Sequence, residues 1–159
     1  MSNQESTMRR VTAIKNGTVI DHVPAGKSLS VLKMLGLDQS LSNPVSMVMN
    51  VPSQKMGAKD IIKVEDRELT QMELDRLALV APEASVSIIR AYSVAEKLDI
   101  NLTGEVVNLA RCTFSNCITI NPREPLPHRL VVTKRDPLEL RCRYCGKTQD
   151  VEALVENLL

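Results

Sequence analysis

Four cysteines in the last third of this chain constrain its structure more than any other residues. Cys112 and Cys117 form a Cys-x4-Cys motif, and Cys142 and Cys145 form a Cys-x2-Cys motif further along. A tetrahedral zinc site takes four thiolates from two short loops of this kind. Gly146 follows the last cysteine, and glycine suits a tight loop because it tolerates positive φ. The spacing predicts a structural zinc site, since four protein ligands leave no position for water.

Two disulfides are the alternative use of four cysteines, in any of the three connectivities that four cysteines allow. The N-terminal sequence MSNQESTMRR contains no apolar segment of the kind that directs secretion. Disulfides are rare in proteins that stay in a reducing compartment. We therefore expect a cytoplasmic protein whose cysteines bind metal. The metal is expected to contribute folding free energy to the C-terminal region.

The composition argues against several classes of function. The 159 residues are 43% hydrophobic, which is enough for one large domain or two small ones with a real core. No apolar run approaches the length that crosses a bilayer, so we expect no membrane partner. The formal net charge is +1, whereas proteins that coat nucleic acid usually carry a strong basic excess.

Strand and helix patterns alternate over the first two thirds of the chain. Apolar residues alternate as in strands over residues 10–15, 18–23, 45–51, 60–64 and 84–94. Helical spacing covers residues 28–37 and the segment before Pro82. Thr70 and Glu73 form a capping box at the start of that second helix. The pair Asn16-Gly17 is a strong signal for a hairpin between the first two strands.

The order of these elements predicts the fold class. Strand, helix, strand, strand, helix and strand follow one another, as in a ferredoxin-like α/β sandwich with helices on one face of an antiparallel sheet. Residues 97–104 are polar and predict a linker. Shorter strands are expected beyond it at 106–110, 130–133 and 138–141, with a short helix or strand at 151–159. We therefore predict an α+β chain with an N-terminal domain, residues 1–100, and a small all-β zinc-binding domain, residues 101–159.

Three sequence strings and the cysteine quartet resemble one known family, the aspartate carbamoyltransferase regulatory chain. Residues 13–25, AIKNGTVIDHVPA, are similar to its N-terminal signature almost letter for letter. Residues 50–53, NVPS, with residues 56–63, MGAKDIIK, form the second match, and residues 77–86, LALVAPEASV, form the third. The strings occur in the family's order, and the resemblance covers nearly the whole chain.

The resemblance implies a regulatory role without catalytic activity. Chains of this family bind nucleotide effectors in the N-terminal domain and contact the catalytic chain through the zinc domain. Homodimers of the regulatory chain link catalytic trimers into a larger enzyme of pyrimidine biosynthesis. CTP acts there as feedback inhibitor, ATP competes as activator, and UTP reinforces CTP in some members.

The resemblance also assigns a nucleotide-binding site. Lys63 and Lys97 match lysines at the ribose and triphosphate, and a lysine ammonium is a compact charge suited to phosphate. Lys59 is similar to a lysine near the phosphates, and Asp21-His22 matches another part of the site. Taken alone, these residues are typical of solvated surface and strand core. The remaining matches are Val11, Ala13, Ile14, Ile89 and Tyr92 around the base, with Ser85 and Val94 beside the ribose and triphosphate.

The first cysteine loop departs from the family's bacterial pattern, which has Pro and Asn where this chain has Thr113 and Phe114. The metal ligands are unchanged, so the departure concerns the contact with the catalytic chain. Aromatic residues are enriched in protein interfaces. We therefore expect an exposed Phe114 to anchor that contact.

Two other functions compete with this interpretation. A zinc ribbon that binds nucleic acid would use the basic residues between 129 and 143, although aromatic residues for stacking make up only 2% of the chain. A small α/β enzyme would need an open metal position or a nucleophile beside a base, and the sequence offers no convincing pair. We therefore predict no partner nucleic acid and no enzymatic activity of the chain itself.

Overall fold

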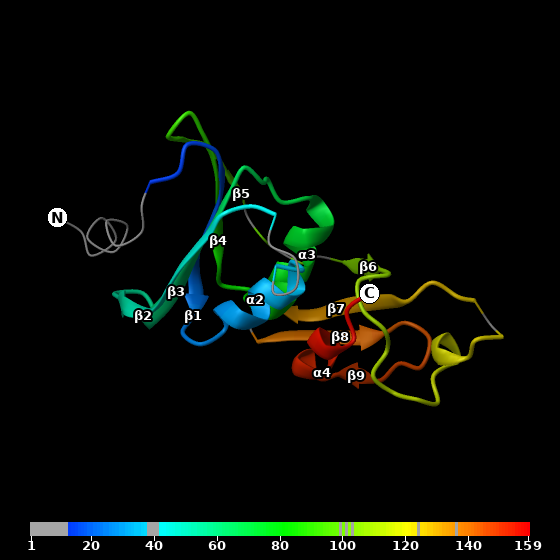
Figure 1. The fold of residues 1–159 in the computed structure, drawn as a ribbon. Helices are drawn as coiled ribbons and strands as arrows, with labels where there is room; N and C mark the ends of the chain where they lie inside the picture. Colours follow the sequence, from blue (N-terminus) through cyan, green and yellow to red (C-terminus); the bar gives the residue numbers. More distant parts are fainter. Residues whose placement is uncertain are drawn as a thin grey trace.

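The computed structural model describes residues 13–37, 42–98, 100, 102, 104–123, 125–135 and 137–159. Within these residues the chain forms a larger antiparallel sheet first and a smaller antiparallel sheet second (Figure 1). The first part of the chain contains β1 (Gly17–Pro24), α2 (Ser28–Met34), β2 (Val45–Ser53), β3 (Gly57–Glu65), α3 (Gln71–Val80), β4 (Ser85–Arg90) and β5 (Ser93–Leu98).

The larger sheet has the strand order expected for the fold class. In the described part of the chain it contains five strands in the order β2-β3-β1-β4-β5, and each neighbouring pair is antiparallel. Both helices lie on one face of this sheet (Figure 1). Ile20, Ile62 and Val86 of the sheet and Val31 and Leu77 of the helices belong to one buried core. The ferredoxin-like prediction is confirmed, with β5 added at one edge.

The predicted hairpin around Asn16-Gly17 is wrong. Residues 13–16 form no strand, residues 10–12 lie outside the described residues, and β1 starts at Gly17 and pairs with β3 and β4 instead. Gly17 has a φ of +144°, and a Cβ added there would lie 2.1 Å from the carbonyl oxygen of Val64. The glycine is therefore required by close contact with β3 and not by a turn.

The single strand predicted over residues 84–94 is also wrong, because β4 and β5 form a hairpin with Ala91 and Tyr92 at its tip. Both residues have positive φ, 51° and 65°. Such two-residue turns usually contain Gly, Asn or Asp, so the sequence lacks the ordinary signal. The tip is instead held from outside: the Tyr92 N–H donates to the Lys15 carbonyl at 2.9 Å, and the Ala91 N–H donates to the Asn16 side chain at 3.2 Å.

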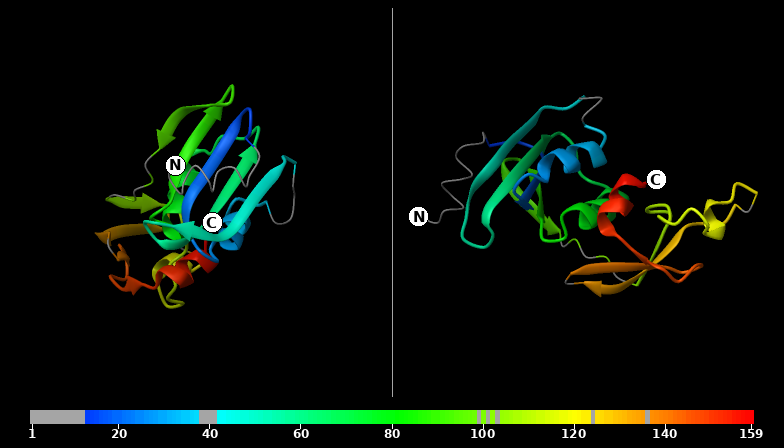
Figure 2. Two further views of the ribbon diagram at one scale, coloured as in Figure 1. Left: turned by 90° about the vertical axis from the view of Figure 1, so that its left-hand side faces the viewer. Right: turned by 90° about the horizontal axis from the view of Figure 1, so that it is seen from below.

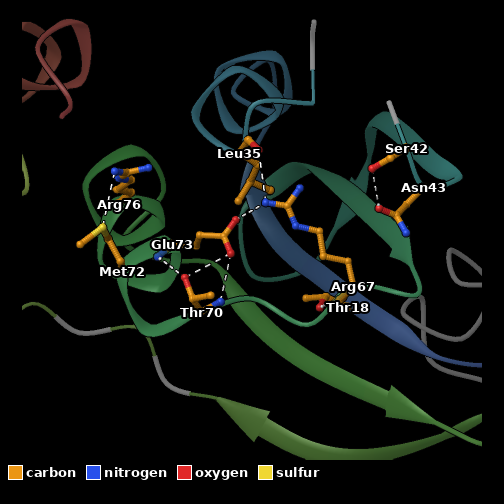
Figure 3. A network of polar contacts seen from close by, with 9 residues as sticks. All are labelled: Thr18, Leu35, Ser42, Asn43, Arg67, Thr70, Met72, Glu73 and Arg76. Atoms are coloured by element: carbon orange, nitrogen blue, oxygen red, sulfur yellow. Dashed lines mark hydrogen bonds and ion pairs between the residues drawn. The ribbon is translucent and has the colours of Figure 1, made fainter. Parts of the chain in front are cut away.

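A polar network joins both helices to the sheet (Figure 3). The predicted capping box is confirmed, since the Thr70 hydroxyl accepts from the Glu73 N–H and the Glu73 carboxylate accepts from the Thr70 N–H. Arg67 donates to the same carboxylate and to the Leu35 carbonyl, 3.3 Å away just beyond α2. The Thr18 hydroxyl of β1 donates to the Arg67 carbonyl at 2.6 Å. One arginine thus ties together α2, α3 and β1.

Asp60 is a fully buried carboxylate that fixes the opposite end of the sheet. It accepts hydrogen bonds from the backbone N–H groups of Asn50, Gly26 and Ser28, at 2.8, 3.0 and 3.2 Å. Burial by itself raises the pKa of Asp60, but hydrogen bonds from Ser28, Asn50 and Gly26 outweigh it and hold the pKa below its ordinary value. The ionised side chain therefore anchors the turn before α2 and the bulge in β2.

The second part of the chain is built on the smaller sheet. Its elements are β6 (Glu105–Val107), the 3-10 helix η1 (Ile118–Ile120), β7 (Arg129–Arg135), β8 (Leu138–Cys142), β9 (Thr148–Gln149) and α4 (Val151–Glu156). The described strands follow the order β6-β7-β8-β9. The expected small β domain is confirmed, and of the helix or strand expected at 151–159 the structure shows the helix α4. Strand β9 is too short to show the alternation that reveals a strand in sequence.

The two parts of the chain pack against each other. Helix α4 lies beside α3 (Figure 2), and Leu154 of α4 shares a core with Leu77 of α3 and Leu130 of β7. Lys97 and Leu98 belong to β5, so the segment expected to be a linker starts later than predicted. Among the described residues, every helix is too short or too polar to span a membrane.

Candidate functional site: a cysteine cluster and an open sheet face

The four cysteines meet in space as the spacing predicted. Their sulfur atoms all lie within 4.8 Å of one another, with Cys112 3.8 Å from Cys145 and Cys117 3.7 Å from Cys142. A tetrahedral ion with metal–sulfur bonds of about 2.3 Å requires sulfur–sulfur distances of roughly 3.8 Å. All four are free cysteines, and these distances exceed a disulfide bond. The cluster therefore fits one tetrahedral metal ion.

The local backbone explains how the second pair of ligands is presented. Cys142 ends β8, its N–H donates to the Lys147 carbonyl at 3.1 Å, and its carbonyl accepts from the Gly146 N–H at 2.9 Å. Gly146 has a φ of +72°, as the tight loop predicted from the sequence requires. Cys145 is the most exposed of the four cysteines, and the other three are buried.

The thiols differ in acidity because their surroundings differ. Burial raises the pKa of the Cys112 thiol to about 12. Burial also acts to raise the pKa of Cys117, but the hydroxyl and the backbone N–H of Thr119 favour its thiolate and lower that pKa to about 7. A bound metal ion needs all four thiolates, so metal binding releases protons here. Metal affinity is therefore expected to rise with pH.

Phe114 is less exposed than the sequence suggested. Its ring is half-buried and packs against the core, and the Lys147 ammonium lies 4.6 Å from the ring centroid. Lys147 thus joins the two cysteine loops through a cation–π contact. Arg141 and Arg143, on either side of Cys142, are exposed.

The face of the larger sheet that α2 and α3 do not cover carries most of the other predicted site residues. Strand register places Lys63, Val19, Ser87 and Lys97 as successive partners across β3, β1, β4 and β5. Cross-strand partners point to the same face, and Ile20, next to Val19, points to the helices. With strands about 4.8 Å apart, the two lysines stand roughly 14 Å from each other at the ends of this row.

A second polar group lies beside this row, where β1 has a bulge. The Lys59 ammonium lies 3.0 Å from the Asp21 carboxylate, and both residues are buried. His22, with a φ of +57°, follows within the bulge, and its Nδ1 lies 3.1 Å from the Ser85 hydroxyl. Burial lowers the pKa of His22, Asp21 raises it, and Lys59 and Lys55 lower it further, with a net decrease. His22 is therefore mainly neutral at about pH 7.

Lys63 is buried beside an apolar cluster on this face, with only 3% of its surface exposed. Burial lowers the pKa of its ammonium group, because the charged form loses hydration. An anion on this face would favour the charged form again. The apolar cluster contains Ile14, Val19, Val51, Ile61 and Ile89.

The remaining predicted residues lie at the border of this face. Tyr92 is exposed at the tip of the β4–β5 hairpin, and Val94, the partner of Ile89, is exposed on β5. Ala13 is exposed at the start of the described chain, and Val11 lies outside the described residues. Sequence reasoning missed Ser87 and Ile61, whose place on this face follows only from the strand order.

Comparison with known proteins identifies the family. Residues 9–101 match the allosteric domain of the aspartate carbamoyltransferase regulatory chain, and residues 104–155 match its metal binding domain. The chain is 43% identical to the Korarchaeum cryptofilum aspartate carbamoyltransferase regulatory chain over 155 residues, which cover 98% of this chain and 97% of the relative. It is 45% identical to the Thermofilum pendens regulatory chain over 94% of each chain. The Pyrococcus abyssi regulatory chain is also 45% identical, over 94% of this chain and 97% of the relative.

These matches cover both parts of the molecule, one with the open sheet face and one with the cysteine cluster. They confirm the resemblance on which the sequence interpretation depends, and they favour it over the two competing functions. The chain belongs to the aspartate carbamoyltransferase regulatory chain family, as a regulatory and non-catalytic subunit with an allosteric domain and a metal-binding domain.

Proposed function

We propose that this chain binds nucleoside triphosphates on the open face of the larger sheet and regulates a partner enzyme through its metal-binding part. The candidate effectors are CTP, ATP and UTP. The row that runs from Lys63 to Lys97 carries the proposal, because it places two cations on one face around apolar side chains. We assign the effector site to the N-terminal domain, residues 1–100, and enzyme contact to residues 101–159.

The chemistry of the face suits a nucleotide. A triphosphate is a polyanion, and Lys63, Lys97 and Lys59 supply point charges along the face. The apolar cluster offers a surface for the base, and Tyr92 has a ring with a polar end at its border. The hydroxyl of Ser85 and the ring of His22, 3.1 Å apart, can bond to the ribose or a phosphate.

Calorimetric titration tests this site directly. CTP is expected to bind saturably to the metal-loaded chain, ATP to displace it, and Lys97→Ala to lose most of the affinity, because the row loses one of its terminal charges. Lys33→Ala, which removes an exposed lysine on α2, serves as matched control. Equal CTP affinity in the two variants would reject the proposed face.

We further propose that the four cysteines hold one structural zinc ion. The sulfur geometry fits a tetrahedral ion, and four thiolates suit zinc, which needs no open position in a structural site. Iron also binds four thiolates tetrahedrally, so elemental analysis of the purified chain decides between them. Zinc would supply cross-linking of the two cysteine loops and no reaction chemistry.

The metal-binding part is proposed to contact the catalytic chain of aspartate carbamoyltransferase in the cytoplasm, with the regulatory chain as a homodimer. Phe114 lies in the first cysteine loop and keeps part of its ring exposed. Phe114→Ala is expected to weaken reconstitution with catalytic trimers about tenfold, as typical for an aromatic interface residue. Measured affinity equal to that of the natural chain would exclude Phe114 as an anchor.

Control of the catalytic chain requires that a nucleotide bind two states differently. Helix α3 packs against the covered side of the larger sheet and also touches α4. Arg76 of α3 donates to the Leu159 backbone carbonyl, and the Arg111 N–H donates to the Asn157 carbonyl at 2.9 Å. We propose that nucleotide binding shifts these contacts together with the segment after β5. Typical coupling free energies between such sites are about 1–3 kcal/mol.

A nucleic-acid-binding ribbon has less support in the structure. Three of the basic residues proposed for it already face carboxylates. Arg129 and Arg143 lie 2.8 and 3.4 Å from Glu105, and Lys134 lies 3.8 Å from Glu139. The family match also provides no nucleic-acid partner. Salt-dependent affinity for single-stranded or duplex nucleic acid would revive this function.

A further inference from the structure

Gln149, on β9, has a side chain that connects the two cysteine loops. It is 3% exposed. Its Oε1 accepts from the N–H and the hydroxyl of Thr113, at 2.8 and 2.7 Å. Its Nε2 donates to the Lys147 carbonyl at 2.9 Å and to the Cys112 sulfur at 3.5 Å. The buried amide thus accepts hydrogen bonds from Thr113 in the first cysteine loop and donates one to Lys147 in the second.

The orientation of this amide is fixed by its surroundings. The Lys147 carbonyl can only accept, so the nitrogen must face it, and the second N–H then points to Cys112. The Thr113 N–H can only donate, so the oxygen must face it. The reversed amide would bring its oxygen against a carbonyl oxygen and a thiolate. The N–H donation to sulfur therefore follows from the hydrogen-bond network.

The sulfur atoms of the cluster differ in the hydrogen-bond donors that reach them. The Thr119 hydroxyl lies 3.0 Å from the Cys117 sulfur. Among the described residues, side-chain donors from outside the cluster reach Cys112 and Cys117, which belong to the first loop. A divalent ion with four thiolates carries a net charge of about −2, and three of these cysteines are buried. Donors to sulfur reduce the cost of that buried charge.

We propose that Gln149 is a positioning residue of the metal centre: it donates an N–H to the metal-bound thiolate of Cys112 and holds both cysteine loops at the distance that the ion requires. This inference depends on the proposed metal binding. Loss of such outer contacts typically lowers metal affinity about tenfold to a hundredfold. Gln149 is not a ligand itself, so its removal should weaken the metal site without changing the ligand number.

Cobalt-loaded protein tests this role. Gln149→Met keeps the side-chain length but cannot donate, and Gln71→Met makes the same change at an exposed position on α3. In competition with a coloured chelator, Gln149→Met is expected to bind cobalt about tenfold to a hundredfold more weakly than the natural chain. Its sulfur-to-cobalt charge-transfer band is expected at longer wavelength, because the Cys112 lone pairs lose a stabilising donor. Gln71→Met should match the natural chain in both measurements.

A third variant separates the tie between loops from the donation to sulfur. Thr113→Val removes one hydrogen bond to Oε1 but leaves the N–H bond from Gln149 to Cys112. It is expected to weaken metal binding less and to leave the charge-transfer band in place. An unmoved band in Gln149→Met overturns the proposal, whether or not affinity falls, because packing loss alone explains a change in affinity.

NMR of the cadmium-loaded natural chain keeps the test decisive if Gln149→Met does not fold. The side-chain amide protons of Gln149 should show scalar coupling to cadmium through the Cys112 sulfur. Their absence, with couplings visible from the cysteine β-protons, overturns the proposal. Failure of the natural chain to bind any of these metals would instead reject the proposed metal centre itself.

Discussion

The open face of the larger sheet and the cysteine cluster both bury groups whose charged forms have opposite sign, ammonium on the sheet and thiolate in the cluster. On the sheet, Lys59 is buried against Asp21, and Lys63 is buried beside the apolar cluster. In the cluster, the group that binds metal is a set of four thiolates. The first region favours a polyanion and the second favours a cation. A ligand of the opposite charge favours the ionised form of such buried groups, so their sign indicates which ligand a region binds.

The two regions also differ in how they are held together. The cysteines come from two short loops beside a small sheet, where a metal ion can supply much of the folding free energy. The open face is the reverse of a sheet whose other side is covered by helices and anchored by Asp60 and Arg67. We therefore expect loss of the metal ion to unfold the metal-binding part, and loss of a nucleotide to leave the larger sheet intact.

Replacement of a metal ligand gives the largest expected effect. Cys142→Ser removes a fully buried thiolate at the end of β8. Structural zinc contributes about 10–16 kcal/mol in small metal-dependent units, so the smaller sheet is expected to unfold and assembly with catalytic trimers to be lost. Amide NMR spectra and gel filtration with the catalytic chain measure both results. Thr148→Ser is the control, and a Cys142→Ser chain that still joins catalytic trimers would contradict the expected role.

Removal of a buried lysine should affect both ligand binding and stability. Lys63→Met is expected to weaken CTP binding about tenfold to a hundredfold, since charge-assisted hydrogen bonds contribute roughly 1.5–3 kcal/mol. The same change also removes the pH-dependent cost of burying the ammonium group. Calorimetry with CTP and urea unfolding measure the two effects, with Lys33→Met as the exposed control.

The contribution of Lys63 to the pH dependence of folding stability has a defined sign. Burial lowers the pKa of Lys63 below 10.5, so between the two values the unfolded chain binds more protons than the folded chain. The natural chain therefore gains stability as pH rises through that range. Lys63→Met should lack this contribution. An identical alkaline stability profile in both chains would show that Lys63 keeps its ordinary pKa.

A smaller effect is expected from His22. Its pKa is lowered mainly by burial, so it gains a positive charge only as pH falls below its ordinary 6.5. CTP binding is then expected to strengthen about twofold to fivefold relative to His22→Gln, through a charge-assisted hydrogen bond. The ratio of the two affinities is the measured quantity, because protonation of the triphosphate affects both chains. A ratio that does not vary with pH would remove His22 from the site.

Protonation of His22 also affects folding. The unfolded chain takes up the proton at a higher pH than the folded chain, so the free energy of unfolding falls as pH drops below 6.5. Urea unfolding of the natural chain and His22→Gln measures this difference. It is expected to disappear when CTP saturates the site, because the ligand then stabilises the charged ring.

The sequence predicted the cysteine cluster well because the spacing of the cysteines along the chain is itself the signal. The order of strands and helices also followed from local patterns, and so did the capping box at Thr70. The β4–β5 turn failed because Ala91 and Tyr92 carry no turn signal and depend on contacts with residues 15 and 16. The hairpin prediction at Gly17 was wrong for the same reason, because close contact with β3 is what requires a glycine there. Long-range contacts of this kind leave no local pattern.

The predicted effector residues depended on the resemblance for a different reason. Lys63 and Lys97 are far apart in sequence, and register across four strands is needed to place them on one face. Gln149 had no signal at all, because a buried amide beside a metal site looks like any polar residue in a short strand.

Methyl NMR of the metal-loaded chain during CTP titration reports on both faces of the larger sheet at once. Val19 and Ile20 are neighbours in β1 but point to opposite faces, and so are Ile61 and Ile62 in β3. If CTP binds the open face, large shifts are expected for Val19, Ile61 and Ile89 on that face, and small ones for Ile20 and Ile62 on the helix-covered face. Saturating CTP that shifts only helix-covered or metal-domain methyl groups would contradict the proposed site.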